Sequence, residues 1–393
     1  IRKYGSRSPL FVEYFYLIFP LTISIAFLYL FEAYSWAVKR SVLPAIAKEL
    51  MVRILTTGLI ILVMLKVLNF KQFINLYALI YIPPVIFLIY SLAKNGDLVF
   101  HFTISSVTKR LKSRIVVFSL FLFSGQALNI LARTLDSIII SSQSSGGLQD
   151  TGIFTIATYF IALMEVPVRS MVGIAFAVLV QAWKDKNKMQ VFDVYRKTAL
   201  NLLVAGLGIM GVLILDMPNI ILHLGPKYQP MMEVVLILGF SKLIDLGTGL
   251  NSHLLLASKH WRIEFTTNIF LVLMAGVFNY LLVRKYGIIG SAWATLISFA
   301  VYNALRFFLI WKFFRMQPFT AKNFYVLVIA GVCFFLTWLL PAIGNIYVDS
   351  FIRAVLFIAL YGFGIIRFNI SADIQAVYKS GLTRLQTIIS KSK

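Results

Sequence analysis

Ionisable residues at helical spacing stand out within long apolar stretches of this sequence. Four of them are basic and three are acidic: Arg133, Arg169, Lys242, Arg306, Asp136, Glu165 and Asp245. They include three pairs of opposite charge that are three or four residues apart, a spacing that places both partners on one face of a helix. Ionisable groups inside apolar segments are costly and by default mark a substrate or ion pathway. The alternative is that each pair satisfies itself and only helps helices to pack.

The two signs of charge predict different chemistry. Arginine binds phosphate through two parallel hydrogen bonds, so the basic set, Arg133, Arg169, Lys242 and Arg306, could hold a diphosphate group. The carboxylates of Asp136, Glu165 and Asp245 could instead bind protons or Na⁺ and couple transport to a gradient. The sequence alone does not separate these roles.

Pro167 lies between Glu165 and Arg169 in one of the apolar stretches. Proline removes a backbone donor and kinks a helix, which frees carbonyl groups that suit the wall of a cavity. We therefore expect Pro167 to act as a kink or gating point, the alternative being a passive kink.

The composition defines the elements that must position these residues. Of 393 residues, 60% are hydrophobic, 15% are aromatic and only 13% are charged, against about 25% charged residues in a soluble domain. These proportions exclude a soluble domain of this size and a disordered chain. We predict an all-α polytopic membrane protein.

A helix needs about 20 mostly apolar residues to cross a bilayer. Eleven ranges satisfy this requirement: 11–35, 54–70, 73–93, 115–141, 152–183, 198–215, 231–257, 265–283, 288–311, 324–340 and 350–366. We therefore expect about eleven transmembrane helices.

The net charge is +22, and the basic residues are distributed as the predicted membrane topology requires. One set of loops, together with the tail from Arg367, holds 24 Lys and Arg residues, and the alternate set holds about nine. Basic residues collect on the cytoplasmic side of membrane proteins, so the richer side and the C-terminus are predicted to be cytoplasmic. From Ser371, apolar residues recur at helical spacing and predict an amphipathic helix on the inner leaflet. This distribution accounts for the net positive charge, so the charge does not indicate binding to nucleic acid.

The sequence offers little chemistry outside the predicted helices. It has one cysteine, Cys333, and four histidines without metal-ligand spacing. It has no nucleotide-binding loop and no Ser/His/Asp arrangement. We therefore predict a transporter and not an enzyme, with no metal or other cofactor apart from coupling to a proton or Na⁺ gradient.

Several segments then point to a family. They are 9–16, 31–34, 150–159 (DTGIFTIATY), 165–170 (EVPVRS), 181–185 (QAWKD), 242–251 (KLIDLGTGLN) and 286–295 (YGIIGSAWAT). Their order and spacing resemble the bacterial polysaccharide (O-antigen or lipopolysaccharide) flippases of the multidrug/oligosaccharidyl-lipid/polysaccharide exporter superfamily. The resemblance covers essentially the whole chain.

The resemblance implies fourteen helices: two pseudo-symmetric six-helix lobes and two C-terminal helices, with the first three helices missing from this chain. It implies that 1–93 is the C-terminal part of the N-lobe (helices four to six) and 94–114 a cytoplasmic linker. It further implies a C-lobe at 115–311 (helices seven to twelve), the two extra helices at 312–366 and an amphipathic cytoplasmic tail at 367–393. Arg133, Arg169 and Lys242 match positions where this family places cavity charge.

The function that the resemblance implies is movement of undecaprenyl-diphosphate-linked oligosaccharide repeat units across the bacterial inner membrane by alternating access, for lipopolysaccharide or surface polysaccharide biosynthesis. The expected partners are the lipid-linked oligosaccharide, membrane lipids, and polysaccharide polymerase and chain-length proteins. Three alternatives stay open. They are a multidrug or cation antiporter of the same superfamily, a peptidoglycan-precursor flippase, and a non-transporting scaffold of a polysaccharide assembly complex.

Overall fold

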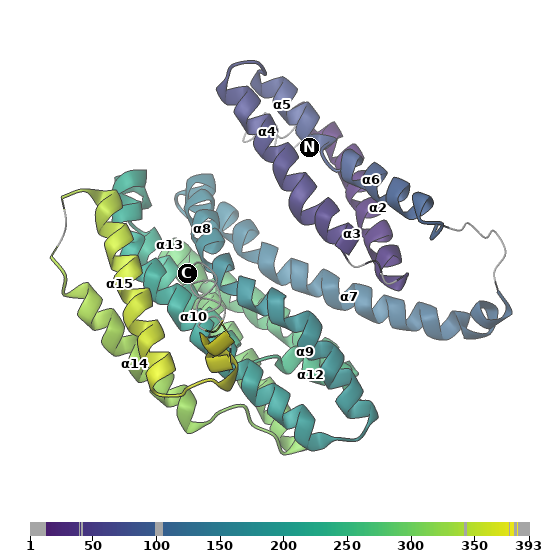
Figure 1. Cartoon of the computed structure of the whole chain (residues 1–393). Helices are drawn as coiled ribbons and strands as arrows, with labels where there is room; N and C mark the ends of the chain where they lie inside the picture. The colour runs from purple at the N-terminus through teal and green to yellow at the C-terminus, as the bar shows by residue number, and fades with distance from the viewer. Residues whose placement is uncertain are drawn as a thin grey trace, which may run out of the picture. The chain divides into compact units, whose positions relative to one another are not determined.

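The computed structural model of the chain describes residues 13–38, 40, 42–98, 105–341, 344–376, 378–380 and 383. Every regular element in these ranges is a helix (Figure 1). The backbone contacts divide the chain into two compact units, Ile1–Lys112 and Ser113–Lys393. We describe each unit by itself.

The first unit contains the helices α2 to α6 and the beginning of α7. It begins with a short 3-10 turn, Phe15–Leu17, that leads into α2 (Ile18–Ala37). A continuous run follows, made of α3 (Val42–Ala45), a π-helical segment (Ile46–Met51) and α4 (Val52–Met64). It ends with α5 (Phe70–Ala78), which starts at a capping box, and α6 (Ile82–Lys94). The predicted span 54–70 is therefore the second half of a helical run that begins at Val42.

The second unit takes most of α7 (Ser106–Gln143) and all later helices. These are α8 (Gly147–Ala162), α9 (Val166–Lys184), α10 (Lys188–Leu224), α11 (Met231–Gly247), α12 (Asn251–Ala257), α13 (Trp261–Phe314), α14 (Ala321–Trp338) and α15 (Ile346–Arg367). The central helix is α10, which packs against α9, α11, α14 and α15. Close packing requires a small residue at Gly211, because a Cβ there would collide with the ring of Phe357 in α15.

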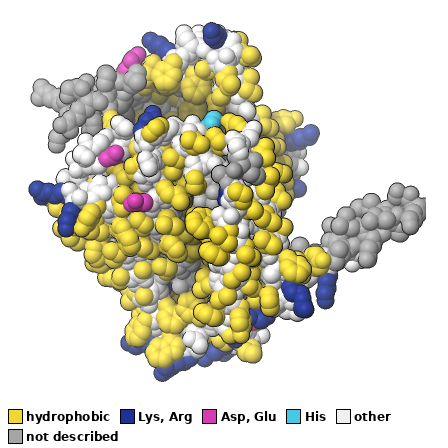
Figure 2. Space-filling view, turned by 90° about the vertical axis from the view of Figure 1, so that its left-hand side faces the viewer, with side chains coloured by type: hydrophobic (Ala, Val, Ile, Leu, Met, Phe, Trp, Pro, Cys, Tyr) yellow, Lys and Arg dark blue, Asp and Glu magenta, His cyan; other side chains and the backbone are white. Residues whose placement is uncertain are grey.

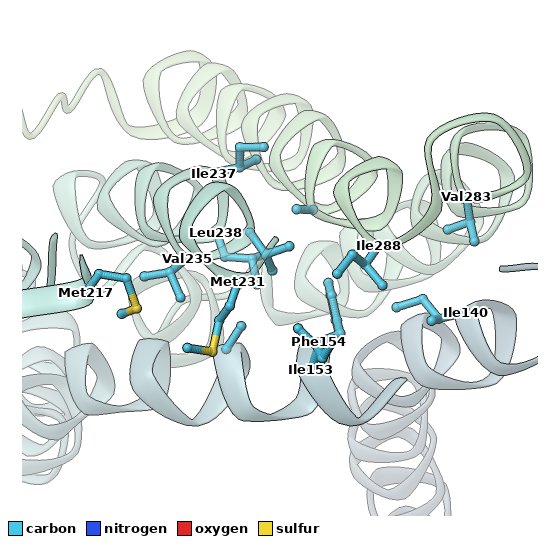
Figure 3. Close-up of a cluster of buried hydrophobic side chains, with 13 residues drawn as sticks. Ile140, Ile153, Phe154, Met217, Met231, Val235, Ile237, Leu238, Val283 and Ile288 are labelled. Atoms are coloured by element: carbon cyan, nitrogen blue, oxygen red, sulfur yellow. The ribbon is translucent and has the colours of Figure 1, made fainter. Parts of the chain in front are cut away.

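The largest hydrophobic cluster joins five helices of this unit (Figure 3). It includes Ile140 of α7, Phe154 of α8, Met217 of α10, Val235 of α11 and Ile288 of α13. All of these side chains are buried. The cluster packs three helices that carry predicted charged residues, α7, α11 and α13, against α8 and α10.

Seven helical segments within the described residues are long and apolar enough to cross a membrane. They overlap eight of the eleven predicted ranges, because one segment, Trp261–Phe314, covers two of them. The other three ranges lie on α4, α7 and α11–α12, and they stay predictions as spans. Hydrophobic side chains cover most of the face shown in Figure 2, with Lys and Arg along its lower edge. The chain is a multi-pass helical membrane protein.

The longest helix, α13, turns back on itself at Gly287. This glycine has φ of 57° and ψ of −136°, a conformation that side chains other than hydrogen rarely allow. The two halves of α13 therefore correspond to the two predicted ranges 265–283 and 288–311.

One predicted span is interrupted. The sequence predicts a single helix over 231–257, but α11 ends at Gly247 and α12 begins at Asn251. Gly249, between them, has φ of 68°, and a Cβ there would lie 2.9 Å from the Cβ of Ala199 in α10. The positive φ and the close approach of α10 together break the helix.

The tail is only partly described. Ile370 and Ser371 are buried, and Ser371 donates a hydrogen bond of 2.6 Å to the side chain of Asn201 in α10. Residues 372–376 and 378–380 are helical, as predicted. Most of the predicted apolar face beyond residue 380 lies outside the described residues.

Candidate functional site

A cavity of about 580 Å³ lies within the second unit. Its wall is formed by residues of all seven helices from α7 to α13. It includes six of the seven predicted charged residues: Asp136, Glu165, Arg169, Lys242, Asp245 and Arg306. The seventh, Arg133, is on α7, but its side chain lies outside the described part of the structure.

Two helix breaks border this cavity. Between α8 and α9 the chain forms a 3-10 turn, Leu163–Glu165, and Pro167 follows in the first turn of α9. This 3-10 turn lies just before the proline, and the kink predicted at Pro167 stays a prediction. The second break, 248–250, separates α11 from α12. Broken helices in membrane proteins place backbone polar groups beside a cavity, where they can be satisfied.

Four charged side chains from the two breaks form one ion-pair network. Arg169 Nη2 lies 3.2 Å from Glu165 Oε2, and Lys242 Nζ lies 2.9 Å from Asp245 Oδ2. These are the two pairs expected from the spacing. Lys242 Nζ also lies 3.3 Å from Glu165 Oε1, so it joins the pairs. The Lys242 side chain is 15% exposed and that of Arg169 is 68% exposed, so the network has a covered and an open side.

Asp136 has neutral partners among the described residues. Asn279 donates to Asp136 Oδ1 at 2.7 Å, and Thr295 donates to Oδ2 at 3.4 Å. The two donors come from the two halves of α13. Ser291 orients the amide of Asn279 by donating to its Oδ1 at 2.7 Å. The expected pair between Arg133 and Asp136 stays a prediction.

Arg306 is the third basic residue of the cavity wall and is 3% exposed. Its Nη2 lies 2.5 Å from Oε1 of Glu264, and its guanidinium carbon lies 4.0 Å from the centre of the Tyr302 ring. It also donates to three neutral side chains, those of Thr267, Asn251 and Asn268. The donors of Arg306 are therefore largely occupied by the protein itself.

Glu264 is a cavity residue that the sequence pattern did not reveal. It is 7% exposed and lines the cavity. It directly precedes the predicted span 265–283, so the sequence places its charge in a loop. The pairing with Arg306 depends on the fold of α13, and a separation of 42 residues gives no local signal for it.

The described part of the cavity wall does not have the excess of basic over acidic side chains that the sequence predicts. Its described lining has three basic side chains, Arg169, Lys242 and Arg306. It has four acidic ones, Asp136, Glu165, Asp245 and Glu264. The predicted excess of buried basic residues does not appear in this part of the structure, and each of the three cations is paired with a carboxylate.

Interrupted helices that meet around a charged cavity are a feature of many secondary transporters. The structure is similar to the solved structure "Lipid II flippase MurJ, inward closed conformation", with a TM-score of 0.63. The match covers 90% of this chain and 71% of the other, at 17% sequence identity. No family model and no curated protein matches the sequence. At this identity the likeness shows that the two proteins share a fold.

Proposed function

We propose that this protein moves undecaprenyl-diphosphate-linked oligosaccharide repeat units across the bacterial inner membrane by alternating access, for lipopolysaccharide or surface polysaccharide biosynthesis. The observation that carries the proposal is the network in which Lys242 joins Glu165 and Asp245 at the two helix breaks. The flippase-like fold and the segments that resemble polysaccharide flippases support it.

Three of the four basic candidates, Arg133, Arg169 and Lys242, bind the diphosphate in this proposal. The fourth, Arg306, is left out of that role because protein side chains occupy its donors. Arg169 and Lys242 are the best supported of them, because Arg169 is mostly exposed and Lys242 lies beside it across Glu165. A diphosphate accepts charge-assisted hydrogen bonds from both cations and replaces their carboxylate partners.

The carboxylates couple this exchange to an ion in the proposal. When a proton or Na⁺ neutralises Glu165 or Asp245, the attraction that holds Lys242 weakens and the ammonium group becomes available to phosphate. Asp136 is the third coupling candidate, held by two neutral donors. In this proposal the 3-10 turn before Pro167 lets α9 change its angle and so serves as the gate.

The topology follows the same proposal. Residues 115–311 form one six-helix lobe of a fourteen-helix protein, 1–93 belong to the other lobe, and 312–366 form the two extra helices. The protein lies in the inner membrane with its C-terminus in the cytoplasm. A polysaccharide polymerase and a chain-length protein are its partners there.

The test is transport in proteoliposomes. The purified protein is offered undecaprenyl diphosphate carrying a fluorescent oligosaccharide and, in parallel, lipid II, for which the similar flippase is named. We expect the double variant Arg133→Gln/Arg169→Gln to lose transport, while Arg262→Gln, at an exposed position outside the cavity lining, retains it. If the double variant supports normal polysaccharide export in cells at normal protein abundance, the cavity is not the transport site and the scaffold alternative is favoured.

The second candidate is a multidrug or cation antiporter of the same superfamily. The four carboxylates in the described wall and the neutral partners of Asp136 favour it. Everted membrane vesicles separate the two candidates. An antiporter exchanges ethidium for protons or Na⁺ and leaves the lipid-linked oligosaccharide in its original leaflet.

A further inference from the structure

A second polar group lines the cavity, separate from the network of Lys242. It lies where α12 meets both halves of α13 and comprises Asn251, Ser252, Glu264, Asn268, Tyr302 and Arg306, all of which line the cavity or contact a residue that does. We call these residues the Glu264 cluster. The ion pairs described for Arg169, Glu165, Lys242 and Asp245 join these four residues to one another.

The Glu264 cluster is poorly suited to bind an anion. Nε, Nη1 and Nη2 of Arg306 each donate to a protein side chain, and the residue is 3% exposed. A phosphate group would have to displace these partners. Arg169, in contrast, is 68% exposed.

The cluster is equally unsuited to bind a cation. Oε1 of Glu264 accepts from Ser252 at 2.7 Å and lies 2.5 Å from Arg306, so its negative charge is compensated at short range. A second positive charge near Glu264 would be repelled by the guanidinium group. A neutral hydrogen-bond donor has no such penalty.

One acceptor in the cluster lacks a hydrogen-bond donor among the described residues. Oε2 of Glu264 is buried, and the described residues supply no hydrogen-bond donor to it. The whole residue is 7% exposed and belongs to the cavity wall. Buried carboxylate oxygens are normally hydrogen-bonded, so this atom indicates a place for a hydroxyl or amide N–H group. Two further wall residues, His253 and Phe299, add a polar ring and an aromatic surface to the same cavity.

The Lys242 network and the Glu264 cluster are close enough for one ligand to contact both. Asp245 lies in the last turn of α11 and Asn251 begins α12, so only the break at 248–250 separates the two groups along the chain. Both groups border the same cavity. A diphosphate at Lys242 and Arg169 therefore leaves the sugar attached to it within reach of the Glu264 cluster.

We propose that the Glu264 cluster binds the uncharged saccharide part of the cargo, with Oε2 of Glu264 accepting a hydrogen bond from a sugar hydroxyl or acetamido N–H, while Lys242 and Arg169 bind the diphosphate. This inference rests on the proposed function and adds a division of the cavity into an anion-binding and a sugar-binding part.

The test compares two ligands on the purified full chain in nanodiscs. The probes are undecaprenyl diphosphate and undecaprenyl diphosphate carrying a disaccharide, and the readout is the Kd of each. We expect Glu264→Gln to weaken binding of the saccharide-bearing lipid about tenfold, as for loss of one hydrogen bond to a charged group, and to leave binding of the bare lipid unchanged. Lys242→Gln weakens binding of both.

Two further variants make the result decisive. Glu233→Gln removes an exposed carboxylate outside the cavity and should change neither Kd. Glu264→Gln leaves Arg306 without its anion, so the double variant Glu264→Gln/Arg306→Met restores neutrality and should show the same selective loss. Size-exclusion chromatography checks that both are folded.

The outcomes separate the inference from the function on which it rests. If the folded Glu264 variants weaken both lipids equally, or neither, the sugar site is wrong while the proposed function stands. If the unsubstituted protein binds neither lipid, the proposed function itself fails, and the inference fails with it.

Discussion

Lys242 in α11 and Glu165 at the start of α9 form an ion pair of 3.3 Å, although 77 residues separate them in the sequence. This contact converts two local pairs, Glu165 with Arg169 and Lys242 with Asp245, into a single network across two helix breaks. A change in the charge of any one member therefore changes the electrostatic environment of the other three. The proposed competition between diphosphate and coupling ion depends on this property.

The first prediction concerns Lys242. Lys242→Gln removes the cation between Glu165 and Asp245, so two carboxylates face each other and the diphosphate loses a partner. We expect at least a tenfold weaker Kd for undecaprenyl diphosphate, since a hydrogen bond to a charged group is worth about 1.5–3 kcal/mol. Lys188→Gln, at an exposed lysine at the start of α10, is the control and should bind normally.

The second prediction concerns Asp136. Asp136→Asn keeps the size of the side chain and removes the charge that Asn279 and Thr295 surround. We expect transport in proteoliposomes to lose its dependence on an imposed proton or Na⁺ gradient, while the Kd of the lipid changes less than twofold. Full gradient dependence in the variant would show that Asp136 is not a coupling residue.

The third prediction concerns the stability of the pair between Arg306 and Glu264. Arg306→Met leaves a buried carboxylate without its cation, which typically costs about 3–5 kcal/mol, so we expect a clearly lower melting temperature in detergent. Arg306→Met combined with Glu264→Gln removes both charges and should recover most of the loss. An unchanged melting temperature in the single variant would mean that the pair contributes nothing to folding.

The fourth prediction concerns the break between α11 and α12. Gly249→Ala places a methyl group at a φ of 68° and 2.9 Å from the Cβ of Ala199, so α10 and α11 must separate. We expect a lower melting temperature and reduced yield of monodisperse protein. Gly331→Ala in α14 is the matched control, because no heavy atom of the described structure lies within 4 Å of its new Cβ. The helical propensity of alanine should make that variant neutral or more stable by about 0.5–1 kcal/mol.

The fifth prediction concerns topology. Cys333 is the single cysteine, so Cys333→Ala gives a background for labelling. Ser145→Cys, in a loop without basic residues, should react with a membrane-impermeant maleimide in intact cells. Lys186→Cys, in a basic loop, should react only after the membrane is permeabilised. The reverse pattern would invert the orientation.

Much of the helical architecture follows from the sequence alone. Length and apolarity locate a span, because a helix in lipid must satisfy its backbone and present apolar side chains over a fixed distance. The ranges 324–340 and 350–366, for example, coincide closely with α14 and α15. The ion pairs within one helix can also be predicted from the sequence, because residues three or four apart lie on the same face of any helix.

The cavity depends on contacts that are distant in sequence. The break at Gly249 reflects the approach of Ala199, and the sequence offers no such neighbour for 248–250. Glu264 gives no signal in the sequence because its partner, Arg306, is brought to it only when α13 turns back at Gly287.

The sequence thus determined that this is a helical membrane protein with charges buried at helical spacing, since hydrophobicity and local periodicity are sufficient for both. Only the tertiary structure determines which charges lie close together. In it Lys242 pairs with Glu165 and Arg306 pairs with Glu264, and Asp136 accepts hydrogen bonds from neutral donors. The physical reason is that electrostatic partnership depends on distance in space, and the distance between helices is set by packing at residues such as Gly211 and Gly249 rather than by the charges themselves.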